Sequence, residues 1–159
     1  MSTMVKITAQ EVNALRKKTG AGMMDCKKAL VEAEGDIEKA IDILRKKGQK
    51  VAAKREDRDA KEGYVTARLN EAGNVGFVFS VNCETDFVAK NEEFRGFAEK
   101  VMDVVVANDP KNVEEALALS FDGSFTVADA ISEQTGKIGE KIEIGSFERM
   151  EGNALTIYI

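Results

Sequence analysis

The chain has 159 residues, of which 43% are hydrophobic and 32% are charged, and its formal net charge is −5. This balance is typical of a folded, soluble chain with one ordinary domain or two small ones, and the negative charge argues against nucleic acid as the main partner. With no histidine and two cysteines, the sequence excludes a Cys–His nucleophile pair, a histidine-rich metal site and a thiolate cage.

The first two predicted helices are separated by a glycine-rich turn. Thr8 and Glu11 have the spacing of a capping box, in which each side chain reaches the backbone N–H of the other residue. The helix that begins there is expected to run to about Lys18. Two glycines within residues 19–22 then favour a turn. A second helix is predicted over residues 23–33, because its apolar residues follow the helical i, i+3, i+4, i+7 spacing.

A third helix and a charged segment follow. Asp36 is the expected N-cap, and the apolar residues after it repeat the helical spacing. Gly48 is expected to end the helix after a basic last turn. Three short amphipathic helices can bury their apolar stripes only against one another, so residues 1–50 predict a three-helix domain. Residues 51–62 carry many charges of both signs and few large apolar residues, which predicts a linker, in part helical through its opposite charges.

The remaining sequence predicts an α+β module with an antiparallel sheet. Alternation from Tyr64 to Leu69 and again from Val75 to Cys83, around a turn at residues 71–74, predicts a β-hairpin. Asn91 is expected to cap a long helix, and Pro110 ends that region. Shorter helices are predicted at Val113–Leu119 and at Thr126–Gln134, the latter capped by Thr126, and strands from Ile142 and over residues 154–159. The predicted fold class is therefore α+β.

The pattern alone leaves the roles of four residues open. Met23 and Met24 are adjacent, so one helix face cannot bury both. Either one lies in the core and the other fills a gap, or the outer one is a soft binding contact. Asp86 is read first as a helix N-cap. Phe87 is either a core residue or, at the tip of a loop, a wedge for a groove in a partner.

Two long segments resemble the signatures of the translation elongation factor Ts family. Residues 15–30, LRKKTGAGMMDCKKAL, are similar to the N-terminal signature of that family. Residues 81–90, VNCETDFVAK, are similar to its second signature. The two occur in the family's order at about its separation. The resemblance covers the whole chain and weakens between Asn108 and Thr126.

This resemblance implies a domain organisation. Residues 1–50 would form a ubiquitin-associated-like three-helix domain, residues 51–62 a linker and residues 63–153 the N-terminal subdomain of the core. Residues 154–159 would begin a second subdomain, which family members normally complete. An unpaired strand in that last segment would offer free backbone N–H and C=O groups, so self-association through it is expected.

The resemblance also implies a function without covalent chemistry and without a cofactor. Family members promote GDP release from elongation factor Tu, so the expected partner is that GTPase in its GDP-bound and nucleotide-free forms. Residues that match the family's partner contacts are Arg16, Met23, Met24, Ile138 and Gly139. Residues that match its magnesium-displacing segment are Thr85, Asp86, Phe87 and Val88.

Rival functions and the cellular location can be weighed from the same sequence. The three helices could instead be a ubiquitin-type adaptor module. An enzyme with an unrecognised small-molecule site is opposed by the lack of histidine and of a catalytic cluster. No apolar run approaches the roughly 20 residues of a membrane span, and the N-terminus has no signal-like region. A cytoplasmic protein without membrane or direct nucleic-acid contacts is therefore expected.

Overall fold

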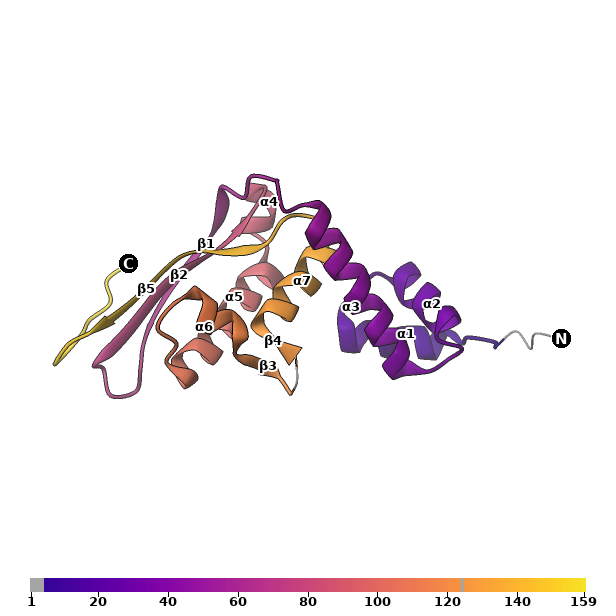
Figure 1. The fold of residues 1–159 in the computed structure, drawn as a ribbon, viewed down its shortest axis with the longest axis horizontal. Coiled ribbons are helices and arrows are strands. Elements are labelled where there is room, and N and C mark those ends of the chain that lie inside the picture. Colours follow the sequence, from indigo (N-terminus) through magenta and orange to yellow (C-terminus); the bar gives the residue numbers. More distant parts are fainter. Residues whose placement is uncertain (1–4, 124) are drawn as a thin grey trace. The chain divides into compact units, whose positions relative to one another are not determined.

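The computed structural model describes residues 5–123 and 125–159, which form two compact units (Figure 1). Unit 1 holds the described residues up to Lys54 together with Ser132–Gly139. Unit 2 holds Arg55–Ile131 and Glu140–Ile159. The predicted absence of a signal region partly concerns residues 1–4, which lie outside the described residues. Within the described ranges, none of the helices combines the length and the apolar character needed to cross a membrane.

Unit 1 begins with three helices, α1 (Ala9–Thr19), α2 (Met23–Glu32) and α3 (Ile37–Lys54). The predicted capping box starts α1. The Glu11 backbone N–H donates to Thr8 Oγ1 at 3.3 Å, and the Thr8 backbone N–H donates to Glu11 Oε2 at 2.7 Å. Both bonds satisfy N–H groups that would otherwise lack a partner at the helix start. This prediction is confirmed.

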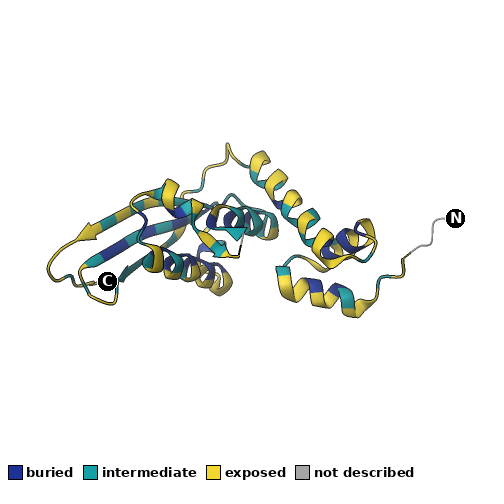
Figure 2. Ribbon diagram, turned by 60° about the horizontal axis from the view of Figure 1, so that its bottom comes forward, coloured by how far each residue is buried: buried dark blue, intermediate teal, exposed yellow. Residues whose placement is uncertain are grey.

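The three helices share one apolar core. Figure 2 shows buried positions in dark blue among the exposed positions of the helices nearest the N-terminus. Its buried members are Val12, Leu15, Cys26, Ala29, Leu30, Ala33 and Ala40. Ile41 and Leu44 of α3 pack against this core. The apolar spacing of each helix thus predicted its inner face correctly, because side chains three and four residues apart lie on one side of a helix.

The prediction that Gly48 ends the third helix is wrong, because α3 continues past it into the expected linker at 51–62. Gly48 is instead a packing residue. A Cβ at this position would lie 3.0 Å from the backbone oxygen of Ser132 in α7 (Val127–Ile138). A Cβ on Gly136 of α7 would lie 2.7 Å from the Gly48 Cα. The missing side chains allow α3 and the unit 1 part of α7 to approach closely.

Unit 2 is built on a three-stranded antiparallel sheet in the order β1-β2-β5, with β1 (Glu62–Leu69), β2 (Val75–Cys83) and β5 (Glu143–Glu151). Phe79 of the central strand pairs with Thr66 on one side and with Phe147 on the other. Alternate residues of β2 are buried, as their pattern predicted. The sheet and its helices confirm the α+β class.

Three helices of unit 2 follow β2, namely α4 (Asp86–Ala89), α5 (Glu92–Asn108) and α6 (Val113–Ala118). The predicted cap of the long helix is confirmed, since Asn91 Oδ1 accepts from the backbone N–H groups of Glu93 (2.9 Å) and Phe94 (3.2 Å). Helix α5 contacts β1 and β2. Its buried side chains are Phe94, Phe97, Ala98, Val101, Met102 and Val105.

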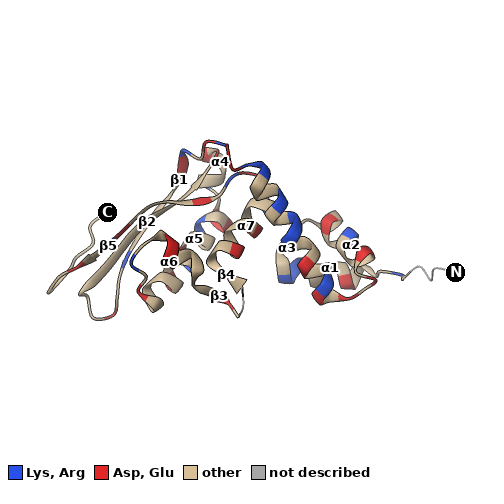
Figure 3. Ribbon diagram, in the orientation of Figure 1, with Lys and Arg blue, Asp and Glu red and all other residues tan. Residues whose placement is uncertain are grey.

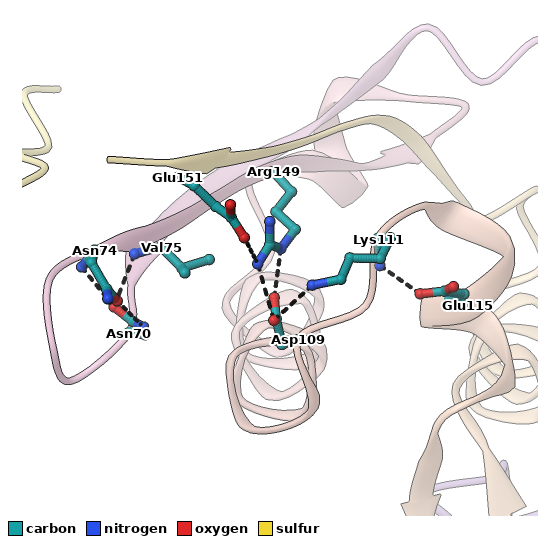
Figure 4. Close-up of polar contacts among 8 residues, drawn as sticks. All are labelled: Asn70, Asn74, Val75, Asp109, Lys111, Glu115, Arg149 and Glu151. Carbon is teal, nitrogen blue, oxygen red and sulfur yellow. Dashed lines mark hydrogen bonds and ion pairs between the residues drawn. The ribbon is translucent and has the colours of Figure 1, made fainter. Parts of the chain in front are cut away.

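An ion-pair network joins the end of α5 to β5 (Figure 4). Asp109 follows α5 in a left-handed conformation, with φ of 52°. Its two carboxylate oxygens accept from Nε and Nη2 of Arg149, at 2.6 and 3.0 Å. Lys111 and Glu151 extend the network through contacts of 2.8 Å to Asp109 and 2.6 Å to Arg149. The bidentate pair of Arg149 and Asp109 fixes the edge strand β5 to the end of α5, the helix that contacts the sheet.

A short hairpin, β3 (Ser120–Asp122) with β4 (Phe125–Thr126), was not predicted. Its strands are too short for an alternating pattern to be recognised. Aromatic contacts support it, because the Phe121 ring lies 5.9 Å from Phe97 and 6.4 Å from Phe125 between centroids. Helix α7 follows directly, and its predicted cap is confirmed by the bond from the Asp129 backbone N–H to Thr126 Oγ1 at 3.2 Å.

The strand predicted over residues 154–159 is not formed. The segment lies instead against the turn between β1 and β2. The Gly152 N–H donates to the Asn74 oxygen at 3.0 Å, and the Leu155 N–H donates to the Gly73 oxygen at 2.9 Å. These bonds to a turn give the segment no neighbouring strand with which to build a ladder. The expected self-association through this segment concerns contacts between chains and stays a prediction.

Candidate functional site

The predicted site residues form two groups, one in each unit. Thr85 to Val88 form one turn of unit 2, where they begin α4. Arg16 and the methionine pair flank the α1–α2 turn of unit 1, and Ile138 and Gly139 end α7 in the same unit.

Phe87 is the most exposed residue of the turn in unit 2. It exposes 83% of its surface, so the interpretation of Phe87 as a core residue is wrong. The helix N-cap is Thr85 rather than Asp86, because Thr85 Oγ1 accepts from the Val88 backbone N–H at 3.5 Å. Asp86 occupies the first turn of α4. Phe87 is thus presented outward from the start of a short helix and is free to enter a groove.

Buried groups hold both ends of this turn. Cys83, at the end of β2, is buried, and its Sγ donates to the Thr85 backbone oxygen at 3.2 Å. Burial, together with the nearby Glu140 carboxylate, raises the pKa of Cys83 to about 11, so the thiol keeps its proton and can donate. At the other end, Ala89 is buried and its oxygen accepts from Arg95 Nε at 3.0 Å.

Two carboxylates join the turn to the chain segment that follows α7. Glu140 Oε1 accepts from the backbone N–H groups of Glu84 and Thr85, at 3.1 and 3.0 Å. Glu140 Oε2 accepts from the Thr85 hydroxyl at 2.8 Å. In return, Glu84 Oε1 accepts from the Lys141 backbone N–H at 2.7 Å and from Arg55 Nη1 at 2.9 Å. Sequence reasoning missed Glu140 and Lys141, because no periodicity relates them to residues 84–85.

Asp86 remains an accessible carboxylate. Lys90, one helical turn away, contacts it at 2.9 Å. The hydrogen bond and charge of Lys90 lower the pKa of Asp86 below its usual value, so Asp86 is ionised at neutral pH. An ionised, exposed carboxylate beside an exposed aromatic ring can approach a cation or a polar network in a partner protein.

The methionine pair in unit 1 is exposed on both residues. Met23 exposes 53% and Met24 61% of its surface, so the interpretation that places one of them in the core is wrong. They begin α2, directly after a turn in which Gly20 has a φ of 67°. The Thr19 hydroxyl stiffens this turn by donating to the Leu15 oxygen at 2.8 Å and accepting from the Ala21 N–H at 3.3 Å. Two soft apolar side chains are therefore available for contact.

The other predicted contacts of unit 1 lie at helix ends. Arg16 is exposed in the last turn of α1, and its backbone oxygen accepts from the Gly20 N–H at 2.7 Å. Figure 3 shows further Lys and Arg positions along α3 of this unit. Ile138 and Gly139 are half-buried. Gly139, with a φ of 81°, closes α7 by donating its N–H to the Thr135 oxygen at 2.8 Å.

The two groups present exposed side chains that can contact another protein. Among residues 5–123 and 125–159, no cluster of three or more potential metal-ligating side chains is arranged around a common point. Both groups combine exposed apolar side chains with charged residues, Asp86 in unit 2 and Arg16 in unit 1. Such a pattern, an apolar anchor beside a charge, is typical of protein-binding hot spots.

Comparison with known proteins relates the whole chain to one family. A model of the family described as Elongation factor TS matches residues 84–159. The chain is 56% identical over 156 residues to elongation factor Ts of Christiangramia forsetii, which covers 98% of this chain and 56% of that relative. It is 54% identical over 156 residues to elongation factor Ts of Flavobacterium johnsoniae, covering 98% of this chain and 48% of the relative.

A third relative is less similar in sequence than the first two. The chain is 48% identical over 153 residues to elongation factor Ts of Amoebophilus asiaticus, covering 96% of this chain and 55% of the relative. In these matches the chain spans about half the length of the curated relatives.

Proposed function

Over the length that it shares with these relatives, the chain belongs to the elongation factor Ts family, and on that premise we propose that it promotes GDP release from elongation factor Tu. The observation that carries this proposal is the exposed Phe87 on a turn that buried groups hold from both sides. Exposure of a large aromatic side chain at a fixed position is characteristic of an anchor for a partner.

The proposed mechanism is disturbance of the partner's nucleotide site. Phe87 wedges between elements of the GTPase, while the ionised Asp86 approaches the magnesium–water network. Magnesium demands near-octahedral coordination at short distances, so a small displacement of its surroundings weakens its binding and that of GDP. By linkage, bound GDP weakens the binding of the exchange factor by the same factor. The chain itself makes and breaks no covalent bond in this mechanism.

Unit 1 supplies further contacts in this proposal. Met23 and Met24 pack on the GTPase surface, where flexible thioether side chains adapt to an irregular groove. Arg16 adds a charged contact close by in the sequence. Ile138 and Gly139 complete the proposed partner-binding set. The GDP-bound and nucleotide-free forms of elongation factor Tu are the proposed partners.

Replacement of Phe87 by alanine tests the proposal. Release of a fluorescent GDP analogue from elongation factor Tu is measured with the unmodified chain, with Phe87→Ala and with Tyr158→Ala. Tyr158 is 98% exposed and serves as the matched aromatic control. We expect Phe87→Ala to slow release by at least about tenfold, the effect of losing one hot-spot contact, and Tyr158→Ala to change nothing.

Stability separates this proposal from a structural role. A buried phenylalanine replaced by alanine costs roughly 3–5 kcal/mol of unfolding free energy. The exposed Phe87 should cost far less, so the variant should unfold at nearly the same denaturant concentration. Normal exchange by folded Phe87→Ala would contradict the proposal.

We also propose that the three helices of residues 1–50 adopt the fold of a ubiquitin-associated domain. In this proposal they share the fold of such domains but do not bind ubiquitin. An adaptor function would require this unit to retain ubiquitin in a pull-down. We expect no retention, and capture of ubiquitin at micromolar concentration would favour the adaptor. A cytoplasmic location is proposed as well, because the proposed partner acts in translation.

A further inference from the structure

We infer that Glu140 is a positioning residue for the exchange reaction, because its carboxylate fixes the turn that presents Phe87. This inference rests on the proposed function. It assigns a role to a side chain outside the exposed contact set, one that acts through the wedge and does not touch the partner itself.

The hydrogen bonds of Glu140 hold the residues before Phe87, and one of these residues bonds in turn to the residue after it. Its Oε1 accepts from the Glu84 and Thr85 N–H groups, and its Oε2 accepts from the Thr85 hydroxyl. The Thr85 hydroxyl oxygen in turn accepts from the Val88 N–H. A continuous chain of hydrogen bonds therefore runs from Glu140 to Thr85, before Phe87, and on to Val88, after it.

The attachment is reciprocal, which prevents rotation about a single bond. While Glu140 accepts from the backbone at Glu84, the Glu84 carboxylate accepts from the backbone N–H of Lys141. Arg55 holds the same Glu84 oxygen from another side. The Lys141 N–H, followed by Arg55, lowers the pKa of Glu84, so the charged form that makes these bonds is favoured at neutral pH. Two bonds in opposite directions fix the turn in both position and orientation.

The exposure of Phe87 explains why such an attachment matters. A ring with 83% of its surface exposed has little packing to determine its direction, so the backbone must determine it. A wedge that is already ordered loses less conformational freedom when it enters the partner. If the turn were loose, fewer encounters would place the ring productively, and the rate of GDP release within the complex would fall.

The inference predicts a separation between rate and affinity. We expect Glu140→Ala to lower the maximal rate of GDP release by on the order of tenfold, because ordering of the wedge is lost. The concentration of chain giving half-maximal rate should change little, because the contacts of unit 1 are intact. Glu140→Gln should retain more activity than Glu140→Ala, since an amide oxygen still accepts from backbone N–H groups. Hydrogen exchange at the amides of Thr85 and Val88 should accelerate in Glu140→Ala.

A double-substitution cycle decides whether Glu140 acts through Phe87. The four chains are the unmodified protein, Phe87→Ala, Glu140→Ala and the double variant, all assayed at a temperature where thermal unfolding shows them folded. Glu140→Gln replaces Glu140→Ala if the latter does not fold. We expect the Glu140 substitution to have almost no further effect once Phe87 is removed, because coupled residues are not additive.

The failures of the two proposals are distinguishable. If Phe87→Ala leaves exchange unchanged, the proposed function fails. If Phe87→Ala slows exchange but the Glu140 substitution slows the double variant by the same factor as the single one, the positioning role is overturned. The role is equally overturned if folded Glu140→Ala exchanges nucleotide at the unmodified rate.

Discussion

Three large apolar residues, Phe87, Met23 and Met24, are exposed on backbone segments that neighbouring polar groups hold in place. Phe87 lies in a turn that the Thr85 hydroxyl helps to hold, and the methionines follow a turn that the Thr19 hydroxyl holds. The hydrogen bonds of the two turns use backbone atoms, hydroxyl groups and the Glu140 carboxylate, and leave the apolar side chains free. Substitution of these exposed side chains should therefore alter binding while the fold persists.

The methionine pair allows a test of this separation. Met24→Asp should weaken binding to elongation factor Tu by about tenfold, because a charge replaces a soft apolar contact. Helicity should persist, since a carboxylate is favourable in the first turn of a helix. Val31→Asp on the same helix is the matched control, because Val31 is 56% exposed and lies at the other end of α2. Calorimetry measures affinity and circular dichroism measures helicity.

The same pair has a defined negative outcome. If Met23→Asp and Met24→Asp both fold and both bind with unchanged affinity, the pair does not belong to the interface. Equal loss in Val31→Asp would mean that charge on α2, and not the methionines, determines the effect.

At the residue scale, the sequence predicted local interactions well and distant ones poorly. The capping pairs Thr8–Glu11 and Thr126–Asp129 are three residues apart, so their spacing alone identifies them. Phe87 and the methionines were placed in the site, but the sequence left open whether they were buried. Glu140 could not have been found, because its bonds to residues 84 and 85 join segments that no periodic pattern relates.

At the scale of elements, glycine determines how α3 and α7 pack. Gly48 and Gly136 leave out side chains where the two helices are closest. This explains why the sequence misjudged the end of α3. Glycine after a basic turn is typical of a helix terminus, and only the position of α7 shows that this glycine serves packing. Local pattern cannot distinguish these two uses.

Alanine substitutions at three helical glycines should have opposite signs. In an open helix position, Gly→Ala stabilises by about 0.5–1 kcal/mol through helix propensity. Gly96→Ala in α5 should do so, because nothing lies within 4 Å of the added Cβ. Gly48→Ala and Gly136→Ala should instead destabilise by about 1–3 kcal/mol, the usual result of overpacking. Urea unfolding of the three variants measures the difference. Stabilisation by Gly48→Ala would show that α3 and α7 do not pack as described.

At the scale of the whole molecule, chain order does not reveal which segments pack together. Residues 132–139 belong to unit 1, although the preceding and following segments belong to unit 2. The charged segment at residues 51–62 indicated two modules, but composition cannot show that a later helix returns to the first. The last residues show the same limit, since their alternation predicted a strand and their position offers no strand partner.

The response of the whole chain to acid follows from its carboxylates. Without histidine, no side chain with an ordinary pKa changes charge between pH 5 and 8, so stability should vary little there. Hydrogen bonds and ion pairs lower the pKa of Glu11, Glu84, Asp86, Glu99 and Asp109. Burial raises the pKa of Glu133, which acts in the opposite direction. Because the lowered groups are more numerous, stability should fall as pH decreases below about 5.

Asp109 provides the sharpest test of this acid response. Its bonds to Arg149, and then to Lys111, lower its pKa to about 2. A carboxylate with a lowered folded-state pKa stabilises the protein above its unfolded-state value of about 3.9, and this contribution is lost as pH falls toward 2. Asp109→Asn should therefore be less stable than the unmodified chain at pH 7, and the difference should shrink below pH 4.

Asparagine suits the variant, because it tolerates the left-handed backbone at this position. Urea unfolding midpoints of both chains from pH 7 to pH 2.5 measure the effect. A difference that stays constant over this range would show that the Asp109 charge contributes nothing to stability.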